Sequence, residues 1–205
     1  MGLFATLNPE QLGRVQRARH AVSPFDIGAC LTQSFEALKR DFWNVVLVNI
    51  VYGLLCCFLI TIPPLTIGIG RFSQKVLEGK PAGMADLFSG FDQFGASWLM
   101  LLVMLPFLLV GFLMCFLPGY YLAIAWSWSW CLLADRRGNF WECLEMSRQA
   151  VTAHWGWAFL LLFVANLVSQ LGFIACFIGI FATLPLQALM VTAAYRRLFA
   201  EPSVA

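Results

Sequence analysis

Charged side chains are scarce in this sequence, and their scarcity excludes an ordinary soluble domain. Only 12% of the 205 residues are charged, whereas 60% are hydrophobic, and a soluble domain normally carries about 25% charged residues. The stretch from Trp98 to Ala134 contains no charged residue at all. The formal net charge of +2 is too small to indicate a nucleic-acid partner. The composition therefore predicts an integral membrane protein that contacts membrane lipid and no nucleic acid.

Signatures of catalytic and metal sites are also missing. The sequence has no Gly-rich phosphate loop and no G-x-S-x-G, H-E-x-x-H or C-x-x-C motif. The two histidines, His20 and His154, stand alone, and the acidic residues show no spacing typical of a metal site or an acid/base pair. An enzyme is therefore disfavoured, and the sequence predicts no cofactor and no metal.

The cysteines also form no motif typical of a metal or redox site. Seven cysteines are present, and we interpret them as small buried hydrophobic residues in a reduced chain. The alternative is a disulfide that joins Cys56 or Cys57 to Cys176. Because no apolar segment precedes the first charged residues, we expect no secretory signal peptide.

Long apolar runs, in contrast, are abundant and predict membrane-spanning helices. A helix needs about 20 apolar residues to cross ~30 Å of hydrocarbon, and the runs lack the alternation of barrel strands. We predict an all-α integral membrane protein with six transmembrane helices that form three hairpins. The domains are a cytosolic N-terminal arm (1–22), the membrane domain (23–199) and a C-terminal tail (200–205). The predicted spans are Phe42–Ile62, Leu65–Gly79, Trp98–Leu117, Pro118–Ala134, Trp155–Cys176 and Ile180–Leu198.

Proline residues mark the expected turns between paired spans. Pro63-Pro64 is expected to end the first span, and Leu117-Pro118-Gly119 is expected to turn the central hairpin. Pro185 is expected slightly inside the last helix. The span Leu65–Gly79 is short and contains Arg71, so the sequence leaves open whether it crosses the membrane completely.

A segment of mixed polarity precedes each predicted hairpin, and we interpret these segments as cytosolic amphipathic helices. In the first, Ser23-Pro24 is the expected N-terminus. The apolar stripes are Ile27, Leu31, Phe35 and Leu38, then Met84, Leu87, Phe88, Phe91 and Phe94, then Phe140, Trp141, Leu144 and Val151. The pattern Cys30-x-x-x-Ser34-x-x-Ala37 also aligns with Cys143-x-x-x-Ser147-x-x-Ala150. Either an internal triplication or shared composition explains this recurrence.

The positive charges predict the orientation of the chain. All thirteen Lys and Arg residues lie in segments on one predicted side. The opposite turns, near Ile62-Pro63, Leu117-Pro118 and Phe177–Gly179, contain no charged residue. Since Lys and Arg accumulate in cytoplasmic loops, both termini are expected in the cytoplasm.

Few residues are candidates for a ligand or partner site. Arg71 is a charge in an apolar context, which is typical of a ligand or ion site, although an arginine that extends to the membrane surface has the same pattern. The other candidates are polar residues inside predicted spans, which either line a substrate path or form hydrogen bonds between helices. These residues are Asn49, Asn166, Ser169, Gln170 and Gln187, of which Asn49, Asn166, Ser169 and Gln170 are the stronger candidates.

Short motifs in the second half of the chain resemble those of a known group of proteins. The motifs are Leu87-Phe88-Ser89-Gly90-Phe91, Leu117-Pro118-Gly119-Tyr120, Leu133-Ala134-Asp135, Ala150 with Trp155, Pro185 and Ala194-Tyr195-Arg196. Over roughly Pro64–Phe199, the chain resembles bacterial multi-pass membrane proteins of unknown function and is similar to the membrane domain fused to some glycerophosphodiester phosphodiesterases. The resemblance implies a six-helix inner-membrane module and assigns no residue. No segment of these 205 residues resembles the catalytic domain of those phosphodiesterases, so the resemblance does not imply that activity.

Two functions follow as expectations. The first is a non-enzymatic inner-membrane module that scaffolds or regulates a partner or organises lipid, with a protein partner or a second copy of the chain as its contact. The second is a small transporter or channel for an apolar, anionic or lipid-like solute.

Overall fold

The computed structural model describes residues 7–20, 26–114, 116–174 and 178–199, with the backbone alone at 171–174 and 178–184. All regular structure in these residues is helical and no strand occurs among them, which confirms the predicted all-α class. The α-helices are α1 (Pro9–His20), α2 (Ile27–Arg40), α3 (Phe42–Leu55), α4 (Ile62–Glu78), α5 (Met84–Phe88), α6 (Phe94–Met114), α7 (Phe116–Ala125), α8 (Ser129–Ala134), α9 (Phe140–Thr152), α10 (Trp155–Ile174) and α11 (Ile178–Phe199). Two 3-10 helices, η1 (Leu59–Thr61) and η2 (Ser89–Gln93), precede α4 and α6.

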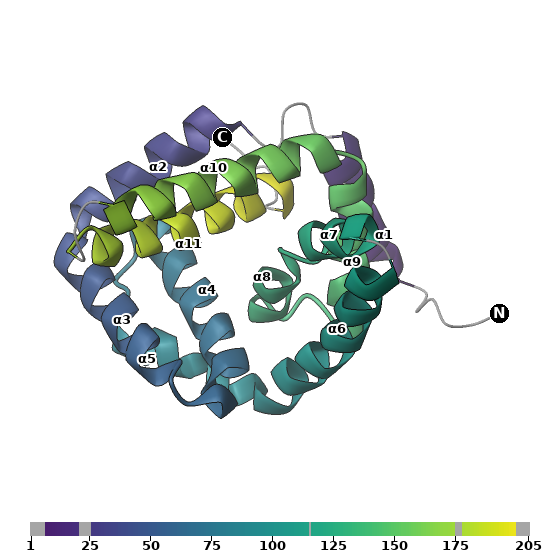
Figure 1. Ribbon diagram of the computed structural model, residues 1–205, viewed down its shortest axis with the longest axis horizontal. Helices are drawn as coiled ribbons and strands as arrows, with labels where there is room; N and C mark the ends of the chain where they lie inside the picture. Colours follow the sequence, from purple (N-terminus) through teal and green to yellow (C-terminus); the bar gives the residue numbers. More distant parts are fainter. Residues whose placement is uncertain (1–6, 21–25, 115, 175–177, 200–205) are drawn as a thin grey trace.

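The long helices surround two central ones. In Figure 1, α3, α6, α10 and α11 lie around the perimeter of the view, and α4 and α8 lie inside it. The central helix α4 contacts α5, η2, α8 and α11, while α10 packs along α11 and α6 packs along α7. The contact of α4 with α5 and η2 is backbone against backbone, because a Cβ atom at Gly68 would overlap the Leu87 carbonyl oxygen. A Cβ atom at Gly90 would overlap the carbonyl oxygen of Pro64 in the same way.

The element order is the same in three consecutive units. Each unit has a helix of mixed polarity, an apolar helix and a returning segment: α2–α3–α4, then α5 and η2–α6–α7 and α8, then α9–α10–α11. The aligned triplets Cys30, Ser34, Ala37 and Cys143, Ser147, Ala150 are all buried. The helices α2 and α9 therefore present the same small-residue face to the bundle.

The prolines lie in other places than the sequence predicts. Pro63 and Pro64 lie in the first turn of α4 and do not end the first span, since α3 already ends at Leu55. Pro118 lies in the first turn of α7, which begins at Phe116 after α6 has ended at Met114. The first-turn position suits proline because its missing N–H has no partner inside the helix there. Pro185 does lie inside its helix, as predicted.

Two predicted spans also have wrong bounds. The helix of the first predicted span, α3, has 14 residues, which gives a length of about 21 Å, too short to cross hydrocarbon alone. The predicted span Pro118–Ala134 is broken, because turn residues Trp126–Trp128 separate α7 from α8. Of the turn predicted near Phe177–Gly179, Phe177 lies outside the described residues, and the backbone of Ile178 and Gly179 already belongs to α11.

Within the described residues, one continuous helical stretch, Met84–Met114, is long and apolar enough to cross a membrane. A second span results if Phe140–Thr152 and Trp155–Gln170, which meet at an angle of 102°, are taken together. The coarse prediction of an apolar helical chain is therefore confirmed, whereas six spans in three hairpins remain a prediction.

The N-terminal elements also differ in detail from the sequence interpretation. In α2 the N-cap is Asp26, whose Oδ1 accepts a hydrogen bond from the Ala29 amide at 3.1 Å. Ser23 and Pro24, the predicted N-terminus, lie outside the described residues. The predicted stripe is only partly buried, with Phe35 at 48% exposure, because the small side chains of α2 face α4 and α11 instead. The N-terminal arm contains α1, which packs on α9 and buries Val15.

Candidate functional site

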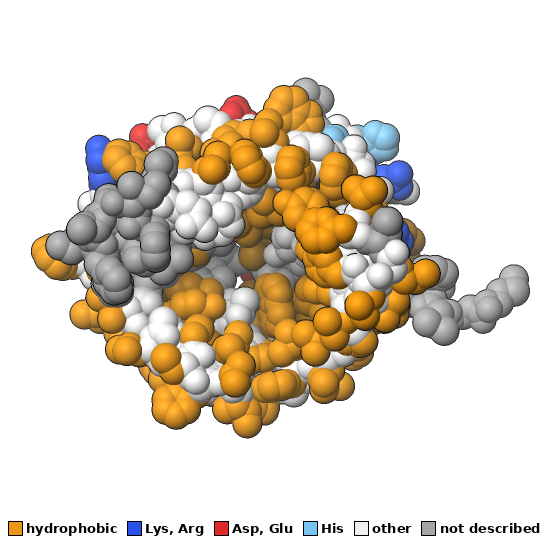
Figure 2. Space-filling model, in the orientation of Figure 1, with side chains coloured by type: hydrophobic (Ala, Val, Ile, Leu, Met, Phe, Trp, Pro, Cys, Tyr) orange, Lys and Arg blue, Asp and Glu red, His pale blue; other side chains and the backbone are white. Residues whose placement is uncertain are grey.

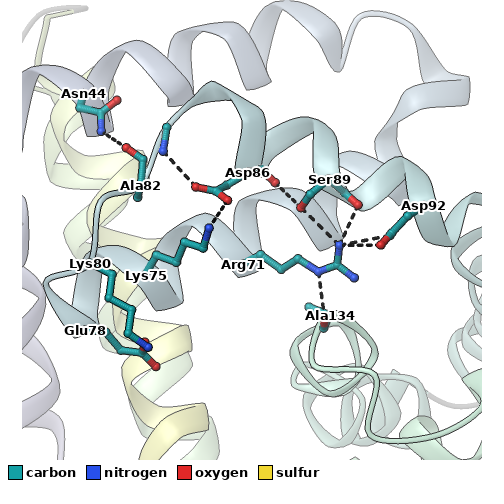
Figure 3. Close-up of polar contacts among 11 residues, drawn as sticks. Asn44, Arg71, Lys75, Glu78, Lys80, Ala82, Asp86, Ser89, Asp92 and Ala134 are labelled. Carbon is teal, nitrogen blue, oxygen red and sulfur yellow. Dashed lines mark hydrogen bonds and ion pairs between the residues drawn. The ribbon is translucent and has the colours of Figure 1, made fainter.

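Arg71, the charged candidate of the sequence, lies on α4 and is fully engaged by neighbouring groups. Its Nε donates to the Ala134 carbonyl oxygen at 3.0 Å, and its guanidinium donates to the Ser89 carbonyl oxygen at 2.7 Å (Figure 3). It also forms an ion pair with Asp92 at 3.1 Å, and its side chain is 17% exposed. With the Gln93 amide nitrogen donating to the Leu133 carbonyl oxygen, the Gln93 oxygen accepts from Arg71 at 2.7 Å. Arg71 therefore ties α4 to η2 and to the end of α8.

Asp92 is the centre of this ionic group, because Arg136 also binds it. Partial burial acts to raise the pKa of Asp92, but hydrogen bonds and charges from Arg136 and Arg71 outweigh burial and hold the pKa below its ordinary value. Arg136 has a φ of 53°, the left-handed region, which turns the chain sharply after α8. The arrangement stabilises the turn that follows α8.

The ends of the three returning helices are joined in a closed triangle of polar contacts. Arg71 of α4 donates to the α8 carbonyl of Ala134, as described above. The Tyr195 hydroxyl of α11 donates to Asp135 Oδ2, just after α8, at 2.6 Å. Arg196 of α11 lies 3.7 Å from Glu78 at the end of α4. This triangle fixes α4, α8 and α11 relative to one another at their C-terminal ends.

A cavity of about 400 Å³ lies beside these three helices, and α3 completes its wall. Figure 2 shows a hollow near the centre of the view, with mainly hydrophobic side chains around it. We call the cavity of about 400 Å³ the apolar cavity. It is lined by Asn49, Tyr52, Gly53, Cys56, Thr66, Ile69, Gly70, Ser73, Ser127, Trp130, Cys131, Gln187, Ala188, Val191 and Thr192.

Four polar side chains of the apolar cavity donate hydrogen bonds to the backbone one helical turn earlier in the chain. Asn49 donates to the Val45 carbonyl oxygen at 2.8 Å, and Thr66, Ser127 and Thr192 donate to the carbonyl four residues earlier at 2.8 Å. Such bonds satisfy the hydroxyl hydrogens and leave an apolar surface with a few polar oxygens. A cavity of this kind suits a hydrocarbon chain better than an ion.

A second cavity, of about 340 Å³, continues along the same three helices. We call it the polar cavity. On α4 it begins at Gln74, next to Ser73 of the apolar cavity, and on α11 it begins one turn after Thr192. It is lined by Gln74, Glu78, Asp135, Arg137, Tyr195, Arg196 and Phe199. An apolar cavity and a charged cavity therefore lie along the same three helices, with no lining residue in common.

The structure brings together only part of the set of residues predicted as a site. Asn49 and Gln187 meet in the apolar cavity, whereas Arg71 belongs to the ionic group with Asp92. Asn166 and Gln170 lie on the exposed outer face of α10, and Ser169 is half-buried beside them. The predicted polar path along α10 therefore does not face either of these two cavities.

Sequence reasoning missed most residues of the two cavities. On α4, Thr66, Gly70 and Ser73 recur at intervals of four and three residues, which places them on one helical face. That small, weakly polar face was a signal for a cavity or close packing. The charged residues at the ends of α8 and α11 are far apart in sequence, and no local pattern showed that they meet.

Among the described residues, no group of three His, Cys, Asp or Glu side chains is placed to hold a metal ion. The described cysteines are free, with Cys30, Cys131 and Cys143 buried and Cys57 exposed. Burial raises the pKa of the Cys143 thiol to about 12, so this thiol stays protonated near neutral pH. Cys176, the proposed disulfide partner of Cys56 or Cys57, lies outside the described residues.

Comparison with known proteins does not assign a family, since no family model, no curated protein and no solved structure matches this chain. The resemblance to membrane domains associated with phosphodiesterases therefore stays a prediction that depends on the short motifs alone.

Proposed function

We propose that this chain is a non-enzymatic, multi-pass module of the bacterial inner membrane that binds a lipid-like molecule in the apolar cavity. Through that molecule it organises lipid or regulates a partner protein. The six-span arrangement with both termini in the cytoplasm is part of the proposal. The observation that carries it is the apolar cavity itself, because its volume of about 400 Å³ lies in the range typical of small-molecule sites.

The outer surface supports placement in a membrane. Large hydrophobic side chains are strongly exposed on α3 and α6, including Trp43 at 82%, Leu113 at 84% and Met114 at 80%. In the most apolar window of Met84–Met114, only 17% of the residues are buried. A continuous apolar surface of this kind needs lipid or another protein to cover it. The buried residues, in contrast, include the serines Ser34, Ser73 and Ser147.

Photolabelling with a diazirine-labelled phospholipid in proteoliposomes tests the proposal. Wild-type protein is expected to carry label on the cavity walls, in peptides around Gly53 and Ile69, as well as on the outer face of α6. Gly53 lines the cavity and has open space around its Cβ position, so Gly53→Phe fills the cavity and is expected to abolish only the cavity label.

The matched control is Gly156→Phe, since Gly156 also has open space around it but lies on the exposed face of α10. Labelling of the cavity should persist in this variant. The proposal is wrong if wild-type protein carries label on α6 and none on the cavity walls.

A transporter or channel for an apolar, anionic or lipid-like solute is the second candidate function. The observation that favours it is the position of an apolar and a polar cavity along the same three helices, because a passage needs both an apolar and an aqueous compartment. Solute flux into liposomes is expected to fall in Gly53→Phe and to be unchanged in Asn166→Ala, whose side chain lies on the outer face. Equal flux in wild type and Gly53→Phe would exclude this route.

A further inference from the structure

The polar cavity has acidic groups that are already engaged. Asp135 Oδ2 accepts a hydrogen bond from the Tyr195 hydroxyl at 2.6 Å. Glu78 forms an ion pair with Lys80 (Figure 3), which is not among the residues that line the cavity. The cavity lining itself holds two arginines, Arg137 and Arg196, and two carboxylates, Glu78 and Asp135. Each carboxylate has a further partner besides the nearby arginine, since Tyr195 donates to Asp135 and Lys80 pairs with Glu78.

The donors of the polar cavity, in contrast, have capacity to spare. Arg137 Nε lies 3.6 Å from Asp135, and an Arg196 terminal nitrogen lies 3.7 Å from Glu78, both longer than a hydrogen bond. The two arginine side chains are 29% and 36% exposed, so they also reach water. The Gln74 amide nitrogen is buried and has no acceptor within the described part of the chain. A buried donor without an acceptor costs free energy that a ligand can recover.

We infer that the polar cavity binds an oxyanion, such as a phosphate group, through Arg137, Arg196 and the Gln74 amide. Guanidinium groups bind phosphate and carboxylate oxygens with paired, charge-assisted hydrogen bonds. The inference rests on the proposed function, because the oxyanion is then the headgroup of the molecule whose chain fills the apolar cavity. Free inorganic phosphate offers the same chemistry, and the experiment below separates the two sources.

Native mass spectrometry of the purified full chain tests the inference with two lipids that share acyl chains. Dioleoylphosphatidylglycerol carries a phosphate, and dioleoylglycerol does not. Wild-type protein is expected to retain the phosphate lipid preferentially, and Arg137→Gln/Arg196→Gln is expected to reduce that preference about tenfold or more. Arg17→Gln is the control, since Arg17 is an exposed residue of α1 with the same charge.

A second variant protects the test against simple misfolding. Gln74→Glu keeps both arginines and the side-chain length but places a carboxylate where the donor was, so it is also expected to lose the preference. Arg137→Lys/Arg196→Lys keeps the charge and is expected to retain part of it. Inorganic phosphate is the second ligand of the test. If phosphate, and not the phosphate lipid, raises the unfolding temperature of wild type but not of Arg137→Gln/Arg196→Gln, the site binds a soluble oxyanion.

The inference is overturned if wild type, the arginine variants and Arg17→Gln show the same lipid preference and the same response to phosphate. Photolabel on the walls of the apolar cavity would then still be present, and the proposed function would stand without a headgroup site. If wild-type protein carried no photolabel on the walls of the apolar cavity, the proposed function itself would be overturned.

Discussion

The hydroxyl of Tyr195 donates a hydrogen bond of 2.6 Å to Asp135, which joins α11 to the residue that follows α8. Tyr195 is only 2% exposed, so water does not readily replace this bond. The contact is one side of the triangle formed with Arg71 and Arg196. It fixes the helix ends between which the polar cavity lies.

Removal of this hydroxyl is expected to loosen the triangle. Tyr195→Phe leaves one buried acceptor of Asp135 without its donor, and the protein should lose about 1–2 kcal/mol of stability. The measurement is the unfolding transition in mild detergent. Tyr120→Phe is the control, because the Tyr120 side chain is exposed at 41% and its change should leave the transition in place. Equal transitions in all three proteins would show that the contact contributes nothing.

The close approach of α4 to α5 predicts a strong effect at Gly68. In Gly68→Ala the new methyl group overlaps the Leu87 backbone, and backbone cannot move aside as a flexible side chain can. We expect a loss of about 3 kcal/mol in stability. Gly95→Ala is the matched control, since nothing lies within 4 Å of its Cβ position, and its stability should change by no more than about 1 kcal/mol. A well-folded Gly68→Ala protein would contradict the described packing.

The ionic group around Asp92 predicts a specific dependence on pH. The pKa of Asp92 in the folded protein is below its ordinary value of 3.8, so the folded state favours the carboxylate. The resulting stabilisation is present above pH 3.8 and is lost as the pH falls through the lower folded pKa. The free energy of unfolding should therefore be higher for wild type than for Asp92→Asn at neutral pH. The two values should converge as the pH falls below the folded pKa of Asp92. A constant difference at every pH would contradict the role of Asp92.

A fourth prediction concerns Arg71, whose hydrogen bonds join α4 to η2 and to the end of α8. Arg71→Leu removes hydrogen bonds to Ala134 and Ser89 and leaves their carbonyl oxygens without that donor. We expect lower stability with unchanged lipid label in the apolar cavity of the folded fraction, because Arg71 does not line that cavity. Loss of the cavity label at unchanged stability would instead assign Arg71 to the ligand site.

The sequence predicted where most helices lie because apolar runs and breaks are local signals. Gly79, for example, ends α4 with a φ of 70°, which suits glycine. Proline was less informative, because the same residue marks the end of one helix or the first turn of the next. Pro63, Pro64 and Pro118 all proved to be of the second kind.

The buried face of a helix was harder to predict. In a chain whose outer surface is also apolar, hydrophobicity does not separate the packed side of a helix from the exposed side. The exposed Phe35 and the buried Cys30 and Ser34 on α2 show this directly. For the same reason the sequence located the polar residues Asn49 and Asn166 but not the direction each one faces.

The central claim, that all charged segments lie on the cytoplasmic side of a membrane, is tested most directly by cysteine accessibility in intact cells. In a background without the other cysteines, the native Cys57, which is exposed in the turn after α3, should react with a membrane-impermeant maleimide from outside. Lys80→Cys and Arg136→Cys, at side chains that are 65% and 66% exposed, should react only after the membrane is permeabilised. Reaction of either of these two positions in intact cells would contradict the proposed topology and the function that depends on it.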